Sequence, residues 1–247
     1  MELGGKIALV TGSAVRIGKS IALALAREGA HLVIHYGGSE GEAQQTANEV
    51  SALGVEAITV QTDLADPAAI MRMFDTIRTH FGKLDVLVNN AASFHKEPFE
   101  EMSVEAWDQV MAVNLRAPFL CIQQAAPLMR PNGGLIVNIS DLAGVYAWHG
   151  FAAHGVSKAG IIHLTKQAAR ELAPEIRVNT IVPGPILPAP GMPLDIWKSL
   201  ADEVPLKRTG TPEHIAQTVI FFAHNDFLTG DTLTVDGGEG LLGPAWH

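Results

Sequence analysis

Short apolar segments alternate with helix-like segments along the whole chain. The apolar segments are near-continuous runs of valine, isoleucine and leucine, which is typical of parallel strands covered on both faces. Such runs lie at residues 6–12, 31–36, 56–64, 84–91, 134–140, 177–184 and 232–238. The alternation predicts right-handed βαβ crossovers, and therefore a doubly wound α/β fold with a seven-stranded parallel sheet and helices on both faces.

Helical patterns fill the intervals between the predicted strands. They cover residues 16–29, 40–53, 66–82, 103–130, 152–173 and 212–223. The helix at 66–82 begins with a capping residue and a proline, Asp66-Pro67. Residues 185–211 are rich in proline and show no clear period, so we interpret them as a lid over a site. No repeat or linker divides the chain, which predicts a single domain over residues 1–247.

Composition and charge narrow the class of protein. Hydrophobic residues make up 47% of the 247 residues, enough for a sizeable core. The formal net charge of −9 argues against nucleic acid or an anionic membrane as the main partner. The single cysteine, Cys121, can form no internal disulfide and is expected to be buried, and no apolar run reaches the roughly 18–20 residues that span a bilayer. The beginning of the chain lacks a signal-peptide pattern and the histidines are scattered, so we expect a cytoplasmic protein with a small-molecule substrate and no metal.

A glycine-containing turn joins the first predicted strand to the first helix. It reads TGSAVRIG over residues 11–18. Gly12 and Gly18 let backbone N–H groups approach a phosphate, and the helix N-terminus favours negative charge. The place of the turn in a βαβ series favours a dinucleotide site over the alternative, an ordinary tight turn.

Four motifs follow one another along the chain: the TGxxxxIG turn, NNA at 89–91, SK at 157–158 and PG at 183–184. In these motifs the chain resembles the classical short-chain dehydrogenase/reductase (SDR) family. The resemblance implies a Rossmann fold, an oxidoreductase that uses NAD(H) or NADP(H), and a homotetramer or homodimer assembled through its long helices. The cofactor-binding residues that it implies are Gly12, Arg16, Ile17, Gly18, Tyr36, Asp63, Leu64, Asn90, Ala91, Lys158, Pro183 and Gly184, with Thr180 near the nicotinamide end.

Two positions bear on the choice between the nicotinamide cofactors. Arg16 stands where the family usually has a third glycine, and Tyr36 stands where NAD-specific sheets place an acid for the ribose 2′-hydroxyl. No carboxylate there repels a 2′-phosphate, and the guanidinium of Arg16 can bind it through two hydrogen bonds. NADP(H) is therefore favoured over NAD(H). The alternative for Arg16 is a solvated surface cation, and Pro188 stands where the family often has a phosphate-contacting threonine.

The resemblance also implies where the catalytic groups lie. The family combines Ser, Tyr, Lys and Asn, and this chain keeps Asn114 and Lys158. His154 replaces the tyrosine, four residues before the lysine, and Asp141 replaces the serine, thirteen residues before His154. Ser140 comes one residue too early, and such a slip at a strand end turns a side chain to the other face. We therefore expect Asn114, Asp141, His154 and Lys158 to be the catalytic residues.

Three features resemble the pteridine reductases within this family: arginine in the phosphate turn, aspartate in the serine position, and NAASF at 90–94. Phe94 falls where a phenylalanine stacks on the pterin, and an aromatic ring there can stack a flat heterocycle. The expected substrate-binding residues are Phe94, Asp141 and, from the predicted lid, Trp197. Plain packing is the alternative for Phe94, and a hydrophobic cover is the alternative for Trp197.

The exchange of tyrosine for histidine leaves two hypotheses open. An imidazole titrates near neutral pH, so it can act as a general acid. Because imidazole is roughly 2 Å shorter than a phenol, His154 would donate its proton through a bridging water, while Asp141 fixes one tautomer. In the other hypothesis His154 is a non-catalytic relic.

These observations predict an NADP(H)-dependent reductase of a carbonyl or C=N bond, with a pterin-like ring as one candidate substrate. One alternative is a 3-oxoacyl-type ketoreductase, which depends most on a proton donor for the carbonyl oxygen. Another is a catalytically impaired protein that binds the dinucleotide and acts as a sensor or assembly partner. A lyase or isomerase that uses the same pocket is also left open.

Overall fold

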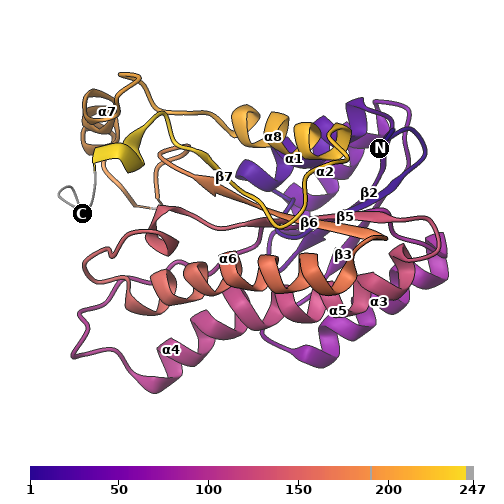
Figure 1. Ribbon diagram of the computed structural model, residues 1–247, viewed down its shortest axis with the longest axis horizontal. Helices are drawn as coiled ribbons and strands as arrows, with labels where there is room; N and C mark the ends of the chain where they lie inside the picture. The colour runs from indigo at the N-terminus through magenta and orange to yellow at the C-terminus, as the bar shows by residue number, and fades with distance from the viewer. Residues whose placement is uncertain (190, 243–247) are drawn as a thin grey trace.

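One parallel sheet forms the centre of the computed structural model, which describes residues 1–189 and 191–242 (Figure 1). Its strands lie in the order β3-β2-β1-β4-β5-β6-β7, so the winding reverses between β1 and β4. Their bounds are β1 Ile7–Val10, β2 His31–Tyr36, β3 Ala57–Gln61, β4 Val86–Asn89, β5 Gly134–Ile139, β6 Ile176–Pro183 and β7 Thr232–Val235. The predicted doubly wound α/β fold with a seven-stranded parallel sheet is confirmed.

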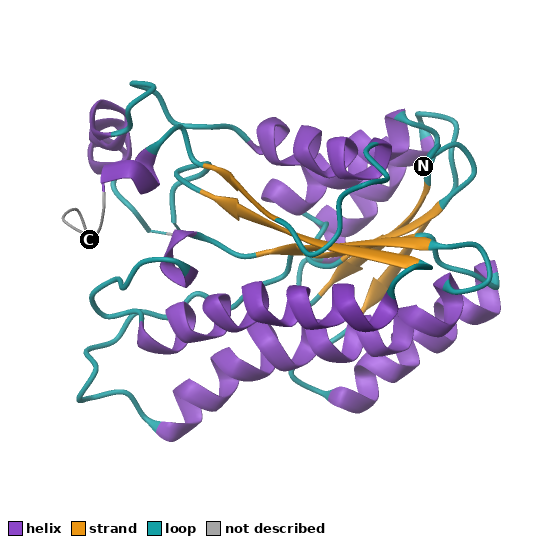
Figure 2. Ribbon diagram, in the orientation of Figure 1, coloured by secondary structure: helices purple, strands orange, loops and turns teal. Residues whose placement is uncertain are grey.

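Helices cover both faces of the sheet (Figure 2). Helices α1, α2 and α8 lie on one face, and α3, α4, α5 and α6 lie on the other. The α-helices are α1 Arg16–Arg27, α2 Glu40–Ser51, α3 Pro67–Phe81, α4 Val104–Met111, α5 Ala117–Met129, α6 Ala152–Leu172, α7 Leu194–Glu203 and α8 Pro212–His224. Three shorter helical segments are η1 Ala112–Arg116, η2 Leu142–Gly144 and η3 Glu239–Leu242.

Each face of the sheet has its own hydrophobic core. Along β1, Ala8 and Val10 belong to the core beneath α1 and α8, whereas Ile7 and Leu9 belong to the core beneath α3 and α5. Successive side chains of a strand point to opposite faces, so a strand covered on both sides needs apolar residues at every position. This requirement explains the continuous apolar runs in the sequence. Cys121 is buried in the second core as expected, and burial raises the pKa of its thiol to about 12.

Two elements differ from the sequence prediction. The stretch predicted as one helix over 103–130 contains a π-helical turn, η1, between α4 and α5. The segment 185–211, predicted to lack regular structure, contains helix α7. The prediction missed α7 because prolines surround this helix of ten residues, none of which is buried.

Candidate active site

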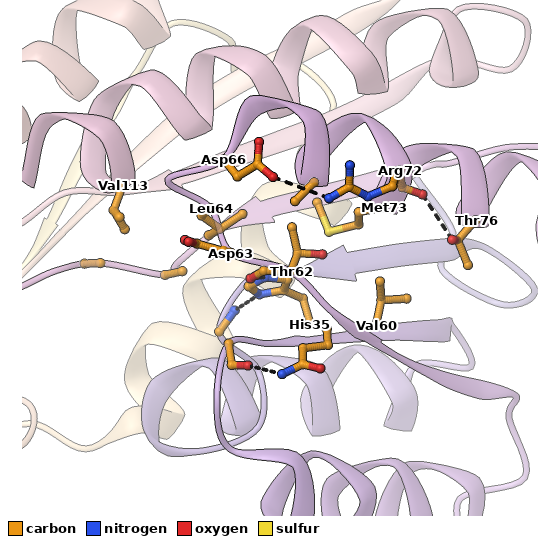
Figure 3. Close-up of a pocket in the computed structure, with 16 residues that line it drawn as sticks. His35, Val60, Thr62, Asp63, Leu64, Asp66, Arg72, Met73, Thr76 and Val113 are labelled. Carbon is orange, nitrogen blue, oxygen red and sulfur yellow. Dashed lines mark hydrogen bonds and ion pairs between the residues drawn. The ribbon is translucent and has the colours of Figure 1, made fainter. Parts of the chain in front are cut away.

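The carboxyl ends of β1, β2, β3 and β4 border a cavity of about 680 Å³ (Figure 3). Ligands of doubly wound sheets bind at such an edge, where the strand order reverses. Lining residues include Gly12, His35, Gly37, Thr62, Asp63, Leu64, Arg72 and Ala91. Gly12, Asp63, Leu64 and Ala91 were predicted from the sequence as cofactor-binding residues. His35 was missed, because none of the motifs that carry the resemblance includes it.

Close backbone packing shapes the turn between β1 and α1. Gly12 has a φ of +64°, and a Cβ atom there would lie 3.2 Å from the Cα of Ala91. At Gly18 a Cβ atom would lie only 2.2 Å from the carbonyl oxygen of Gly12. Asn90, which directly follows β4, fixes the turn, because its Nδ2 donates to the carbonyl oxygen of Thr11 at 2.8 Å. Side chains at either glycine would fill the space that a phosphate-binding loop keeps open.

Arg16 and Ile17 begin helix α1 in different surroundings. Arg16 has a φ of +56°, a region that favours glycine, and its Nη2 donates to the carbonyl oxygen of Pro188 at 2.8 Å. This bond ties the phosphate turn to the proline-rich segment. Ile17 is half-buried and packs against the core beneath α1.

Tyr36 is the last residue of β2, and its ring faces away from the cavity. The ring is only 8% exposed and belongs to the core beneath α1. The next residue, Gly37, lines the cavity instead. Alternation along the strand turns the Tyr36 ring to the other face, and the role of Tyr36 in binding the cofactor stays a prediction. The end of β2 therefore still presents no carboxylate to the cavity, since Gly37 has no side chain.

The π-helical turn η1 carries Asn114 inward, a kind of distortion that often marks functional sites. Asn114 is 2% exposed, and both ends of its amide are used. Its Oδ1 accepts from the backbone N–H of Ser93 at 2.7 Å, and its Nδ2 donates to the carbonyl oxygen of Ser93 at 2.9 Å. These bonds fix the loop after β4 against η1, and Nδ2 of Asn114 also contacts the hydroxyl of Ser157 on α6 at 3.2 Å.

His154 and Asp141 form a close pair at the start of α6. The Nε2 of His154 lies 2.5 Å from the Oδ2 of Asp141. On the other side of the ring, Nδ1 lies 3.4 Å from the Nδ2 of Asn114 and 3.3 Å from the carbonyl oxygen of Ser93. The ring can therefore accept from Asn114 when neutral and donate to Ser93 when doubly protonated. Only 2% of the His154 side chain is exposed, against 21% of the Asp141 side chain, so Asp141 is the accessible member.

Asp141 and Lys158 shift each other's ionisation. Burial raises the pKa of Asp141, but the hydrogen bond from His154 and the positive charge of Lys158 outweigh it and bring the pKa below its usual value. Burial lowers the pKa of Lys158, and the charge of Asp141 opposes this effect in part. Asp141 is therefore a carboxylate at neutral pH. It lies between the imidazole of His154, which donates a hydrogen bond, and the positive charge of Lys158.

Lys158 and Ser140 are both tied into the protein interior. The Nζ of Lys158 donates to the carbonyl oxygen of Ile139 at 2.9 Å. Ser140 is 2% exposed and its hydroxyl donates to the carbonyl oxygen of Lys158 at 2.9 Å, which agrees with the expectation that it does not replace the family serine. A Cβ atom at Gly144 would lie 2.7 Å from the carbonyl carbon of Lys158, so η2 packs tightly on α6 at this point.

Aromatic rings surround the His154–Asp141 pair. Phe94 is 48% exposed, and its ring centre lies 4.9 Å from that of His154 and 4.8 Å from that of Phe151. Trp148 stacks edge-on against Phe151 at 5.9 Å. The sequence prediction found Phe94 but missed Phe151 and Trp148. Trp197 lies half-buried on α7, and its contact with a substrate stays a prediction.

The end of β6 lies close to β7. A Cβ atom at Gly184 would lie 2.6 Å from the Cβ of Asp236, so the chain after Pro183 requires glycine. Thr180 is fully buried, and its hydroxyl donates to that of Thr165 at 2.6 Å. Thr180 lies within the strand rather than at its end, and its approach to the nicotinamide stays a prediction.

Comparisons with known proteins place this geometry in a family. The sequence model of a family described as enoyl-(acyl carrier protein) reductase matches residues 12–239. The 3-oxoacyl-[acyl-carrier-protein] reductase FabG of Staphylococcus aureus is 40% identical over 245 residues, which cover 94% of this chain and 97% of that protein. A short-chain type dehydrogenase/reductase from Mycobacterium marinum has a TM-score of 0.89 and 32% identity, with 97% of each chain covered. The chain belongs to the short-chain dehydrogenase/reductase family.

A further SDR-like structure bears on the cofactor. The blue fluorescent protein from a metagenomic library, solved in complex with NADPH, has a TM-score of 0.90 and 35% identity to this chain. The alignment covers 97% of this chain and 100% of the blue fluorescent protein. As a member of the SDR family, the protein is an oxidoreductase with the Rossmann-type fold described above.

Two kinds of feature are missing from residues 1–189 and 191–242. None of the helices in these ranges is both long and apolar enough to cross a membrane. Within the same ranges, His, Cys, Asp and Glu side chains nowhere gather in threes as a metal site would require.

Proposed function

We propose that this SDR protein is an NADP(H)-dependent reductase of a carbonyl or C=N bond in which the Asp141–His154 pair supplies the proton. The observation that carries the proposal is the 2.5 Å contact between His154 Nε2 and Asp141 Oδ2, beside Lys158 and Asn114. By the resemblance of the sequence motifs, these two side chains would stand in the positions of the family serine and tyrosine.

The residues at the sheet edge fit a dinucleotide. A Cβ atom would clash with the backbone at Gly18 and would be crowded at Gly12. The buried hydroxyl of Thr62, a lining residue of the cavity, has no hydrogen-bond partner within the described part of the chain. Gly12, Gly18 and Ala91 would line the phosphate site, and Lys158 would hold the nicotinamide ribose, as in the family. When bound, NADP(H) supplies the hydride. Arg16 is available to the 2′-phosphate if it exchanges Pro188 for that group.

The proton leaves through Asp141 rather than directly from His154. Both ring nitrogens of His154 face protein groups and only 2% of its side chain is exposed, so no ring nitrogen is open to a substrate. The doubly protonated ring passes a proton from Nε2 to the Asp141 carboxylate, and the carboxyl group passes a proton to the substrate oxygen or nitrogen. The step leaves neutral His154 and an Asp141 carboxylate, which the positive charge of Lys158 stabilises. This route needs no water between His154 and the substrate.

Two substrate classes are candidates, each for a different reason. The exposed Phe94 ring beside the pair suits a flat heterocycle with a C=N bond, such as a pterin. The similarity to a 3-oxoacyl-[acyl-carrier-protein] reductase favours a 3-oxoacyl thioester instead. We propose the flat ring as the first candidate, because a carboxyl donor beside an aromatic face suits protonation of a ring nitrogen, and the 3-oxoacyl thioester as the second.

The experiment follows NADPH oxidation against pH with 7,8-dihydrobiopterin and with acetoacetyl-CoA. We expect Asp141→Asn and His154→Gln each to lower kcat by about 100-fold or more. Lys166→Gln, a change on the exposed side of the same helix, is the control and should match the wild type. Equal rates in all four proteins would refute the pair as proton donor. NADPH binding without oxidation of either substrate would favour the dinucleotide-binding protein without turnover.

A further inference from the structure

His35 lies under the phosphate turn, at the carboxyl end of β2. Alternation along this strand sends Leu32, Ile34 and Tyr36 into the core beneath α1 and leaves Val33 and His35 on the opposite face. His35 is 2% exposed and lines the cavity at the sheet edge (Figure 3). A polar ring buried at this place has to find its hydrogen bonds inside the protein.

Both nitrogens of the His35 ring bond to backbone groups of other segments. Nδ1 accepts from the backbone N–H of Gly12 at 2.9 Å, and Nε2 lies 3.1 Å from the carbonyl oxygen of Thr62. A backbone N–H can only donate and a carbonyl can only accept, so the ring is the neutral tautomer with its proton on Nε2. Burial lowers the pKa of His35 to about 4, which keeps this neutral form at physiological pH.

The main chain of His35 strengthens the same connection. Its carbonyl oxygen accepts from the backbone N–H of Ser13 at 3.0 Å, and its N–H donates to the Ser13 hydroxyl oxygen at 3.1 Å. Two consecutive N–H groups of the turn, from Gly12 and Ser13, are therefore both anchored on this one residue. Gly12 has a φ of +64°, so the bond to Nδ1 fixes a backbone conformation that a free chain would often leave.

We infer that His35 is a positioning residue, which holds the Gly12 turn in the conformation that accepts a dinucleotide phosphate. It acts through the turn and does not itself react. The inference rests on the proposed function only in that the ligand is a nicotinamide dinucleotide. If His35 served only to fill the core, a leucine side chain of similar size would replace it without changing the conformation of the Gly12 turn.

Two substitutions at His35 separate these roles. In His35→Asn, Oδ1 occupies the place of Nδ1 and can still accept from Gly12, whereas His35→Leu leaves that N–H without an acceptor. His31→Leu is the matched control. It removes a similar bond, in which His31 Nδ1 accepts from the backbone N–H of Glu56 at 2.9 Å, at the opposite end of the same strand.

The first measurement is NADPH binding by calorimetry, with thermal unfolding of each free protein alongside. We expect His35→Leu to raise the Kd for NADPH by about tenfold or more, His35→Asn to restore most of the affinity, and His31→Leu to bind as the wild type does. The KM for NADPH should rise in His35→Leu with little change in kcat. A Kd in His35→Leu equal to that of the wild type would overturn the inference, and failure of the wild type to bind NADPH would overturn the proposed function instead.

A second measurement needs no variant and covers the case in which His35→Leu does not fold. With ¹⁵N-labelled histidine, the His35 ring of the wild type should show an unprotonated Nδ1 and a protonated Nε2 at neutral pH. The amide proton of Gly12 should exchange slowly in the free protein. A protonated Nδ1, or rapid exchange at Gly12, would contradict the bond on which the inference depends.

Discussion

At the residue scale, Asp141 and His154 stabilise each other, and neither residue can be explained without the other. The carboxylate of Asp141 is stabilised by the imidazole 2.5 Å away, and the buried imidazole has its Nε2 partner in that carboxylate. Removing either one leaves the other buried without its main partner, which costs more than the bond itself contributes. Asp141 and His154 therefore form one unit.

A double-mutant cycle tests this coupling. We expect Asp141→Ser and His154→Tyr each to lower the free energy of unfolding, and the double variant, which restores the family pair, to lose less than the sum. The coupling free energy should be about 1–3 kcal/mol, measured by urea denaturation. The exposed pair His95 and Glu97, 3.0 Å apart, is the control and should couple by less than about 1 kcal/mol. Additive losses at Asp141 and His154 would show that the two residues act independently.

The sequence could predict this pair but not its orientation. The thirteen-residue spacing between Asp141 and His154 matches that of the family serine and tyrosine, so their proximity followed from the resemblance. Their exposure depends on how Phe94, Asn114 and the loop after β4 pack around them, and spacing holds no information on that packing. His35 escaped prediction for a similar reason, since its partners are backbone groups brought together only by the fold.

At the element scale, local patterns predicted what is buried and missed what is exposed. Strands such as β1 and β5 are buried at every position, so their apolar runs were unmistakable. Helix α7 buries none of its residues, and no core constrains its sequence. The π-helical turn η1 leaves no trace in periodicity, because it adds only a local change to a continuous helix. The elements that form the core can therefore be predicted from the sequence, whereas the elements that shape the site are harder to predict.

The contact between α1 and the proline-rich segment leads to a prediction about cofactor choice. Arg16 Nη2 already donates to the carbonyl oxygen of Pro188, so the guanidinium is held at the mouth of the phosphate turn. We expect Arg16→Ala to lower NADPH affinity by about tenfold or more while NADH affinity changes little, because only NADPH has a 2′-phosphate for the guanidinium to bind. Calorimetry with both cofactors gives the ratio of the two affinities.

Two other arginines serve as comparisons in that experiment. Arg78 pairs with Asp75 on α3 and does not line the cavity, so Arg78→Ala should bind both cofactors as the wild type does. Arg72 does line the cavity. If Arg72→Ala rather than Arg16→Ala abolished the preference for NADPH, the 2′-phosphate would be bound from α3, and the role proposed for Arg16 would be wrong.

At the scale of the whole molecule, one side of the helical layer is left with an apolar groove. It has a volume of about 630 Å³, lies between η1, α5 and α6, and is lined by Leu115, Phe119 and Leu164. Phe119 is 48% exposed there, and a Cβ atom at Gly160 would lie 2.9 Å from the side chain of Leu115, so η1 and α6 pack closely. The resemblance to the SDR family implies assembly through these long helices, which makes a second copy of the chain the expected occupant.

The groove also carries opposite charges on one helical stretch, Asp108 and Arg116. In a two-fold contact each residue of one copy can face the other in its partner, so the surface is complementary to itself. We expect the wild type to sediment as a dimer or tetramer and Phe119→Glu to sediment as a monomer, because a buried carboxylate without a partner opposes association. Met71→Glu, at a residue 56% exposed on α3, should leave the assembly unchanged. A monomeric wild type in sedimentation velocity would contradict the expectation. Helix α6, which carries His154 and Lys158 in its first turns, would then be held in place only by contacts within its own chain.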